Sequence, residues 1–204
     1  MLIKRICLIA VLSALISGVK LAMAFLPNIE VVTLLFIVIT LIFGFTIAIS
    51  TSLVFVLLEI LIWGYNPWWV TLYIVYWPLL VGFVYLASEL CKGKTGGSKQ
   101  YLNAFKASPQ KTAKQNFYKK SKVSNLTLIV VIAIGILMTI MFGVISTIIE
   151  IIFMEAIGTG QFWEFVFWRY IAGIPFFIVH VSSNAITLPI LLPKVVKSLE
   201  RVRI

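Results

Sequence analysis

Long apolar stretches separated by short polar breaks occupy almost the whole chain. Residues 6–26, 31–63, 68–90, 126–154 and 162–192 carry few charges, and a transmembrane helix needs about 20 such residues. The stretch 31–63 is too long for one helix, and Gly44, followed by polar residues, indicates a turn between two short ones. The pattern predicts an all-α integral membrane protein with six transmembrane helices, at approximately 6–26, 30–43, 45–63, 67–90, 126–154 and 163–192.

Proline and glycine mark the ends and bends of these helices. Three breaks separate helices on one side of the membrane, at Pro27-Asn28, at 64–67 and at Gly158-Thr159-Gly160. Pro67 fits the first turn of the fourth helix, where its missing N–H has no intrahelical acceptor. Internal prolines predict a kink at Pro78, a bend at Pro175, and an end of regular helix between Pro189 and Leu192-Pro193.

Residues 91–125 form the only long polar segment, rich in Lys, Ser, Gly, Gln and Asn. We expect a cytoplasmic loop here, with a surface helix around Tyr101–Phe105. The remaining chain leaves no room for a sizeable soluble core, so residues 1–204 are predicted to form a single membrane domain.

The positive charges predict the orientation of this domain. Fifteen of the 17 Lys and Arg residues lie near the N-terminus, in the middle segment or in the C-terminal tail: Lys4 and Arg5, nine lysines between Lys92 and Lys122, and Lys194, Lys197, Arg201 and Arg203. Positive loops stay on the cytoplasmic side. Both termini and the loop are therefore expected inside a plasma membrane, which four helices before the loop and two after it satisfy. The net charge of +10 thus needs no nucleic-acid partner.

The first apolar stretch resembles a signal peptide, because Lys4-Arg5 precedes it and Ala22-Met23-Ala24 resembles a cleavage site. Its length, Lys20 within it and the further apolar stretch after it favour a retained first helix. Cys7 and Cys91 are isolated at expected cytoplasmic ends, so neither a disulfide nor a metal site is predicted.

Catalytic motifs are missing from the sequence. Gly93-Lys94-Thr95 resembles the end of a phosphate-binding loop, but the required first glycine is Ser88. The chain contains no Asp, a single His, and neither HExxH nor GxSxG. We therefore expect no enzymatic activity and no cofactor.

A few polar residues interrupt the apolar stretches, where each is costly unless it faces protein or water. Lys20, Glu59, Glu150 and Arg169 are expected near the outer ends of four helices, Glu30, Glu155 and Glu164 in the outer loops, and His180 and Asn184 deeper. One interpretation is pairing between helices, Glu59 with Lys20 and Glu150 with Arg169. The other is a polar pocket that opens outward. For His180, a packed and hydrogen-bonded side chain is the alternative to ligand contact.

Tryptophans gather at the outer ends of the predicted helices, at positions 63, 68, 69, 163 and 168, with Trp77 about two turns inside. An aromatic belt at the headgroups explains such residues. Because no Trp decorates the inner ends, a cavity that stacks on a flat ligand is the second interpretation.

The first helix carries small residues at one-turn spacing, Ala10 and Ala14 followed by Ser17 or Gly18. Small residues let helices approach closely in lipid. The stripe serves either a partner protein or packing against the other helices of this chain.

Four stretches together resemble the substrate-binding S components of energy-coupling-factor (ECF) vitamin transporters. They are the AxxxA motif at Ala10–Ala14, Phe25-Leu26-Pro27-Asn28-Ile29-Glu30 with 31–35, Asn66-Pro67-Trp68-Trp69 through 77–80, and Ile178-Val179-His180 with Asn184 before a basic tail. The resemblance covers most of the chain outside 91–125.

The resemblance implies an importer subunit that captures a micronutrient at the outer face. Such a subunit then associates with a transmembrane coupling subunit and two ATPases, and topples in the bilayer to release its ligand. The implied ligand is cobalamin first, then other flat heterocyclic vitamins. The candidate substrate-binding residues are Lys20, Asn28, Glu30, Glu59, Trp68, Trp69, Trp77, Glu150, Arg169, His180 and Asn184, and the candidate partner interface is Ala10, Ala14, Ser17 and Gly18.

Three other functions compete with this one. The basic segment 92–122 could recruit anionic lipid or an acidic partner to a membrane scaffold. The chain could also be an autonomous carrier or channel, which would need no ATP, or a membrane enzyme, which the missing catalytic groups disfavour.

Overall fold

Six α-helices form the described part of the computed structural model, which covers residues 2–26, 29, 31–94, 123–157 and 162–202. They are α1 (Leu2–Ala22), α2 (Val32–Phe43), α3 (Phe45–Trp63), α4 (Pro67–Lys94), α7 (Asn125–Ile157) and α8 (Phe162–Val202). No strand occurs in these ranges, so the all-α prediction is confirmed. The predicted surface helix at 101–105, the turn at 158–160 and the break at Pro27-Asn28 lie outside the described residues.

Five of these helices, α1, α3, α4, α7 and α8, are long and apolar enough to cross a membrane. The helix α2 has 12 residues and is therefore about 18 Å long, against the roughly 30 Å of a hydrocarbon core. The chain thus has the helices of a multi-pass membrane protein. The second predicted span, at 30–43, is therefore too short to cross by itself.

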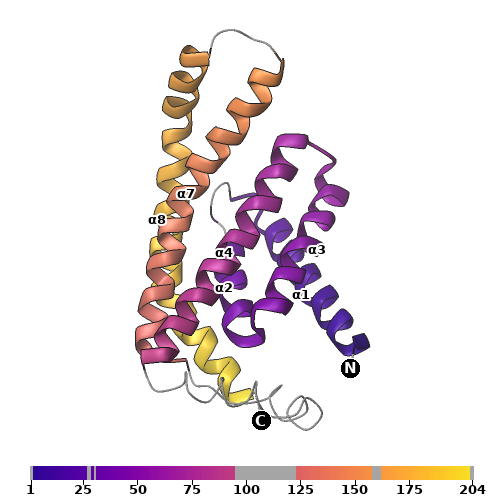
Figure 1. Ribbon diagram of the computed structural model, residues 1–204, viewed down its shortest axis with the longest axis vertical. Helices are drawn as coiled ribbons and strands as arrows, with labels where there is room; N and C mark the ends of the chain where they lie inside the picture. Colours follow the sequence, from indigo (N-terminus) through magenta and orange to yellow (C-terminus); the bar gives the residue numbers. More distant parts are fainter. Residues whose placement is uncertain (1, 27–28, 30, 95–122, 158–161, 203–204) are drawn as a thin grey trace.

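The short helix α2 lies at the centre of the bundle and contacts each of the other five helices (Figure 1). Nine of its 12 residues are buried, and Phe36 and Ile37 are fully enclosed. A helix that is apolar on all sides is stable only where protein or lipid surrounds it. Its unbroken apolar sequence therefore produces the core on which the other helices pack.

The other helices surround α2 in two groups that meet at α4. On one side α1 packs on α3, and α3 packs on α4; on the other side α7 packs on both α4 and α8. The helices α7 and α8, with 33 and 41 residues, are the longest, and their ends at one pole project beyond the remaining helices (Figure 1).

Both termini lie at the opposite pole of the bundle, together with the end of α4 and the start of α7 (Figure 1). The side chains of Lys4, Arg5, Lys194 and Lys197 are exposed. The basic ends of the described helices therefore share one pole, as the charge pattern predicts. Which side of a membrane this pole faces stays a prediction.

Two glycines make the turns that flank α3. Gly44 (φ 81°) joins α2 to α3 as a single residue, and its N–H donates to Thr40 O over 3.1 Å. Gly64 (φ 85°) ends α3, and its N–H donates to Ile60 O over 2.9 Å. Both backbones are in the left-handed region, which favours glycine. The predicted turns at Gly44 and at 64–67 are confirmed.

Two predicted helix ends are wrong. The first helix ends at Ala22 instead of continuing to Leu26, because the chain tightens into i→i+3 bonds such as Leu26 N–H to Met23 O, over 2.9 Å, just before Pro27. The last helix continues past Leu192-Pro193 to Val202. Its buried stripe of Leu188, Leu192 and Val196 carries the same packing face through the prolines, and helices in lipid tolerate them.

The helices α7 and α8 approach closely around one aromatic ring. A Cβ at Gly143 of α7 would lie 2.7 Å from the ring of Phe177, and a Cβ at Gly173 of α8 would lie 2.8 Å from the same ring. Phe177 therefore lies against both glycines, and a side chain at either position would have to displace its ring. Small residues of this kind let helices in lipid approach each other.

We expect Gly143→Ala to destabilise the bundle by about 1–3 kcal/mol, because the added methyl group overpacks the Phe177 contact. Gly82→Ala in α4 is the matched control, since open space surrounds its Cβ position. The midpoint of unfolding of the purified protein in detergent measures both. A Gly143→Ala midpoint equal to that of Gly82→Ala would contradict the close approach of α7 and α8.

Candidate functional site

A buried ion pair joins α1 to α3. Lys20 Nζ donates to Glu59 Oε2, and the side chains are only 14% and 4% exposed. Lys20 Nζ also donates to the Tyr73 hydroxyl of α4 over 2.9 Å. Lys20 lies in the last turn of its helix, where a cation complements the helix dipole. One ammonium group therefore connects three helices, and the pairing of Glu59 with Lys20 that the sequence suggested is present.

Aromatic rings enclose this ammonium group. Its nitrogen lies 4.7 Å from the ring centroid of Tyr73, 5.1 Å from that of Trp69 and 5.8 Å from that of Phe55. Cation–π attraction adds about 0.5–2 kcal/mol at such distances and grows when water is excluded. Trp69 is itself held in place, because it stacks on Tyr73 at 5.2 Å and meets Trp68 edge-on at 6.2 Å.

Lys20 also borders a cavity of about 410 Å³, which we call the Lys20 cavity. Its wall comes from the end of α1, the connection to α2, the start of α2, the end of α3, the start of α4 and the middle of α8. The lining residues are Lys20, Met23, Ala24, Leu26, Ile29, Val31, Val32, Trp63, Trp69 and Phe176. Lys20 is the only charged residue among these described residues.

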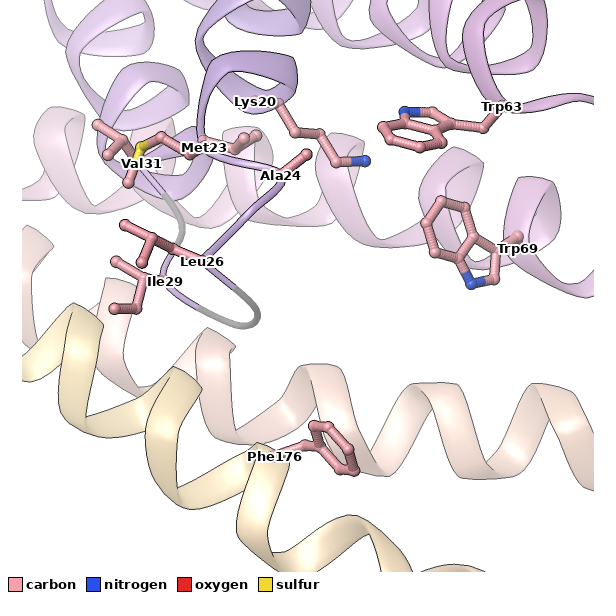
Figure 2. A pocket seen from close by; sticks show the side chains of 10 residues that line it. Lys20, Met23, Ala24, Leu26, Ile29, Val31, Trp63, Trp69 and Phe176 are labelled. Atoms are coloured by element: carbon pink, nitrogen blue, oxygen red, sulfur yellow. The ribbon is translucent and has the colours of Figure 1, made fainter.

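Figure 2 shows the Lys20 side chain extending towards the indole rings of Trp63 and Trp69, with Phe176 of α8 across the open space. Trp63 is half exposed, as expected for a ring with one free face. The cavity lies where α1 ends and α2 begins, away from the pole with both termini and below the projecting ends of α7 and α8 (Figure 1). That it faces outward stays a prediction.

The second charged pair lies elsewhere. Arg169 of α8 donates from Nε to Glu150 Oε2 and from Nη2 to Glu150 Oε1, the latter over 3.1 Å, so the two groups pair in the bidentate form that suits guanidinium. Neither residue is among the described residues that line the Lys20 cavity. The four charged residues that the sequence placed at similar depth thus form two separate pairs, and the Glu150–Arg169 pair fastens α7 to α8.

Three further candidates lie in the core. Trp77 is 2% exposed and packs against Phe36 with ring centroids 4.9 Å apart. His180 is 6% exposed, and its ring meets Phe142 edge-on at 5.4 Å. Asn184, fully buried, donates from Nδ2 to Thr139 Oγ1 over 3.1 Å. The described surroundings of these residues are those of packed core side chains.

The small residues of α1 divide between its two faces. Ala10, Ala14 and Gly18 are exposed and follow one another at four-residue spacing, whereas Ser17 is buried. The exposed face therefore presents a groove of small residues, and Ser17 belongs to the packing against the rest of the bundle.

Asn28 and Glu30 lie outside the described residues, and their roles stay predictions. Trp63 was named from the sequence only among the outer tryptophans. The candidate site residues omitted the rest of the apolar wall, namely Met23, Ala24, Leu26, Ile29, Val31, Val32 and Phe176. Sequence reasoning searched for polar groups, whereas the wall is mainly apolar. The signal that could have found these residues is the short connection between Lys20 and the apolar stretch of α2. A connection this short cannot bury its apolar side chains by itself, so they face a neighbouring cavity.

No three His, Cys, Asp or Glu side chains gather in the described part of the chain. Cys7 is exposed and Cys91 is buried, and neither forms a disulfide among the described residues.

Comparisons with models of protein families, with curated proteins and with solved structures find no match to this chain. Its function is therefore argued from its own residues.

We expect Lys20→Met alone to destabilise the protein by about 3–5 kcal/mol, because it leaves the Glu59 carboxylate buried without a cation. The double variant Lys20→Met/Glu59→Gln should recover most of that loss, since both charges disappear together. Unfolding midpoints of the two single variants and the double variant measure the coupling. The same cycle on Arg169 and Glu150, which are 27% and 15% exposed, is the matched control and should give a smaller coupling. Additive effects at Lys20 and Glu59 would contradict the pairing.

Proposed function

We propose that this chain is the substrate-binding S component of an ECF-type importer, which captures a vitamin-like heterocycle at the outer face. The observation that carries the proposal is the Lys20 cavity, which lies away from the pole with the termini. It combines a mainly apolar wall, two indole rings and one oriented charged group, which is the composition expected of a small-molecule site.

The size of the cavity limits the ligand. Ligand pockets range over about 300–1,000 Å³, and the Lys20 cavity of about 410 Å³ is near the lower end. This volume favours a single flat heterocycle over cobalamin, which is much larger. The two tryptophans supply flat apolar faces for such a ring.

The exposed face of α1 supports a membrane partner. Ala10, Ala14 and Gly18 leave a groove with no large side chain, and a Cβ at Gly18 would meet nothing within 4 Å. Without water to expel, helices in lipid associate through such close contacts. In the proposed assembly this groove receives a helix of the coupling subunit, and two ATPases supply the energy.

In the proposed orientation, both termini and the segment 95–122 face the cytoplasm across a plasma membrane. The Lys20 cavity then opens outward, where the ligand arrives. The exposed cations at the opposite pole lie beside anionic lipid and nearest to the ATPases.

Co-expression with the coupling subunit and ATPases of the same cell tests this function. We expect a stable complex that takes up its ligand into vesicles only when ATP is supplied. Ligand uptake by the isolated chain without ATP would instead favour an autonomous carrier. A chain that performs its cellular role without any ATPase, and loses it when 95–122 is deleted, would favour a scaffold.

We expect Ala14→Trp to reduce recovery of the complex and ATP-dependent uptake at least about tenfold, because an indole fills the groove. Leu15→Trp is the control, since Leu15 is already large and 50% exposed beside the groove. Both variants should keep the unfolding midpoint of the wild type, because both positions face outward. Normal assembly of the Ala14→Trp variant would rule out this groove as the interface.

A further inference from the structure

Among the residues that the structure describes, Glu59 balances the charge of Lys20 at the Lys20 cavity. Lys20 is the only cation among the described lining residues, and Glu59 is paired with it directly behind the wall. Glu59 is 4% exposed, and its second oxygen, Oε1, has no hydrogen-bond partner within the described part of the chain. The Glu59 carboxylate therefore offsets the charge of the ammonium, with little water to screen the pair.

Two described residues accept hydrogen bonds from the ammonium group, which leaves one donor for a ligand in this part of the chain. A lysine ammonium has three N–H groups, and two of them donate to Glu59 Oε2 and to the Tyr73 hydroxyl. The remaining N–H belongs to a side chain that lines the Lys20 cavity beside Trp63 and Trp69 (Figure 2). A group that accepts one hydrogen bond there can at the same time lie against an indole face.

We propose that the Lys20 cavity selects an uncharged, flat heteroaromatic ligand with a hydrogen-bond acceptor, and rejects carboxylated or phosphorylated forms of the same ring. The acceptor receives the third N–H of Lys20, and the ring stacks on Trp69, which Trp68 and Tyr73 hold in place. An anion gains little from a lysine that Glu59 already neutralises. It also meets repulsion from Glu59 and loses its hydration against an apolar wall. This inference names the ligand class for the function proposed above.

Matched pairs of ring compounds test the selectivity on the full chain in lipid nanodiscs at pH 7. The probes are nicotinamide with nicotinate, pyrazinamide with pyrazinoate, and quinoline-3-carboxamide with quinoline-3-carboxylate. Ligand-observed NMR gives the dissociation constant of each. We expect each carboxamide to bind at least about tenfold more tightly than its carboxylate.

The variant Glu59→Gln separates charge balance from simple packing. It leaves the Lys20 charge without its partner, so the preference should move towards the carboxylates by about tenfold or more. Glu150→Gln is the matched control, since Glu150 pairs with Arg169 away from the described lining of the cavity. It should leave the ratio unchanged. Trp69→Ala, which keeps both charges, should weaken both members of each pair about tenfold without changing their ratio.

Several results would overturn the inference. They are equal or tighter binding of the carboxylates to the wild type, no binding of any carboxamide, and equal effects of Glu59→Gln and Glu150→Gln. If Glu59→Gln does not fold, Trp69→Ala decides, because undiminished binding by that variant places the ligand elsewhere. Assembly with the coupling subunit is measured separately. Selective binding without assembly would refute the proposed importer and support the ligand class. Assembly with the wrong selectivity would refute the ligand class and support the proposed importer.

Discussion

The structure depends on the cost of a charge within an apolar bundle. A cation in lipid costs about 2.5–3.5 kcal/mol or more unless a partner or water compensates it. Lys20 meets this constraint through Glu59, Tyr73 and the surrounding rings, and in doing so it ties the end of α1 to α3 and α4. The helix α1 ends two residues after Lys20, and apolar residues of the connection that follows form part of the cavity wall. The same contact therefore stabilises the bundle and shapes the cavity.

The two ion pairs, Lys20–Glu59 and Glu150–Arg169, have different consequences. Glu150 and Arg169 fasten α7 to α8, the two longest helices. Two nitrogens of the guanidinium donate to the two oxygens of the carboxylate, which is the bidentate contact these groups favour. The Lys20 pair leaves one donor and one carboxylate oxygen unused among the described residues, and it adjoins the cavity. This difference separates a structural pair from one that can also serve a ligand.

Most of the fold could be predicted from the sequence, because the length of each apolar stretch and the glycines that interrupt it determine where a helix begins and ends. Helices near 32–43, 45–63 and 67–94 agree within a few residues with the prediction. The end of α8 could not be predicted in this way. Pro189 and Pro193 signal a local break, while the buried Leu188, Leu192 and Val196 that override it act through packing with other helices.

The candidate site was only partly predictable for the same reason. Lys20, Glu59 and Trp69 stood out as costly or unusual residues in apolar stretches, and they do meet. His180, Asn184 and Trp77 carried the same signal but lie in the core, where Asn184 donates to Thr139 and the rings of His180 and Trp77 pack against other aromatic rings. Apolar wall residues such as Leu26 and Phe176 carry no signal at all, since their role arises only where distant helices meet.

The central claim is that the balanced Lys20–Glu59 pair and its two tryptophans form the wall of a ligand site. Native mass spectrometry of the protein, purified in mild detergent from its own cell, tests it most directly. The wild type should retain a small uncharged heterocyclic molecule in a one-to-one complex. Ala24→Trp, which fills the Lys20 cavity at an exposed position, should release it. Identical spectra for the two proteins would contradict the account.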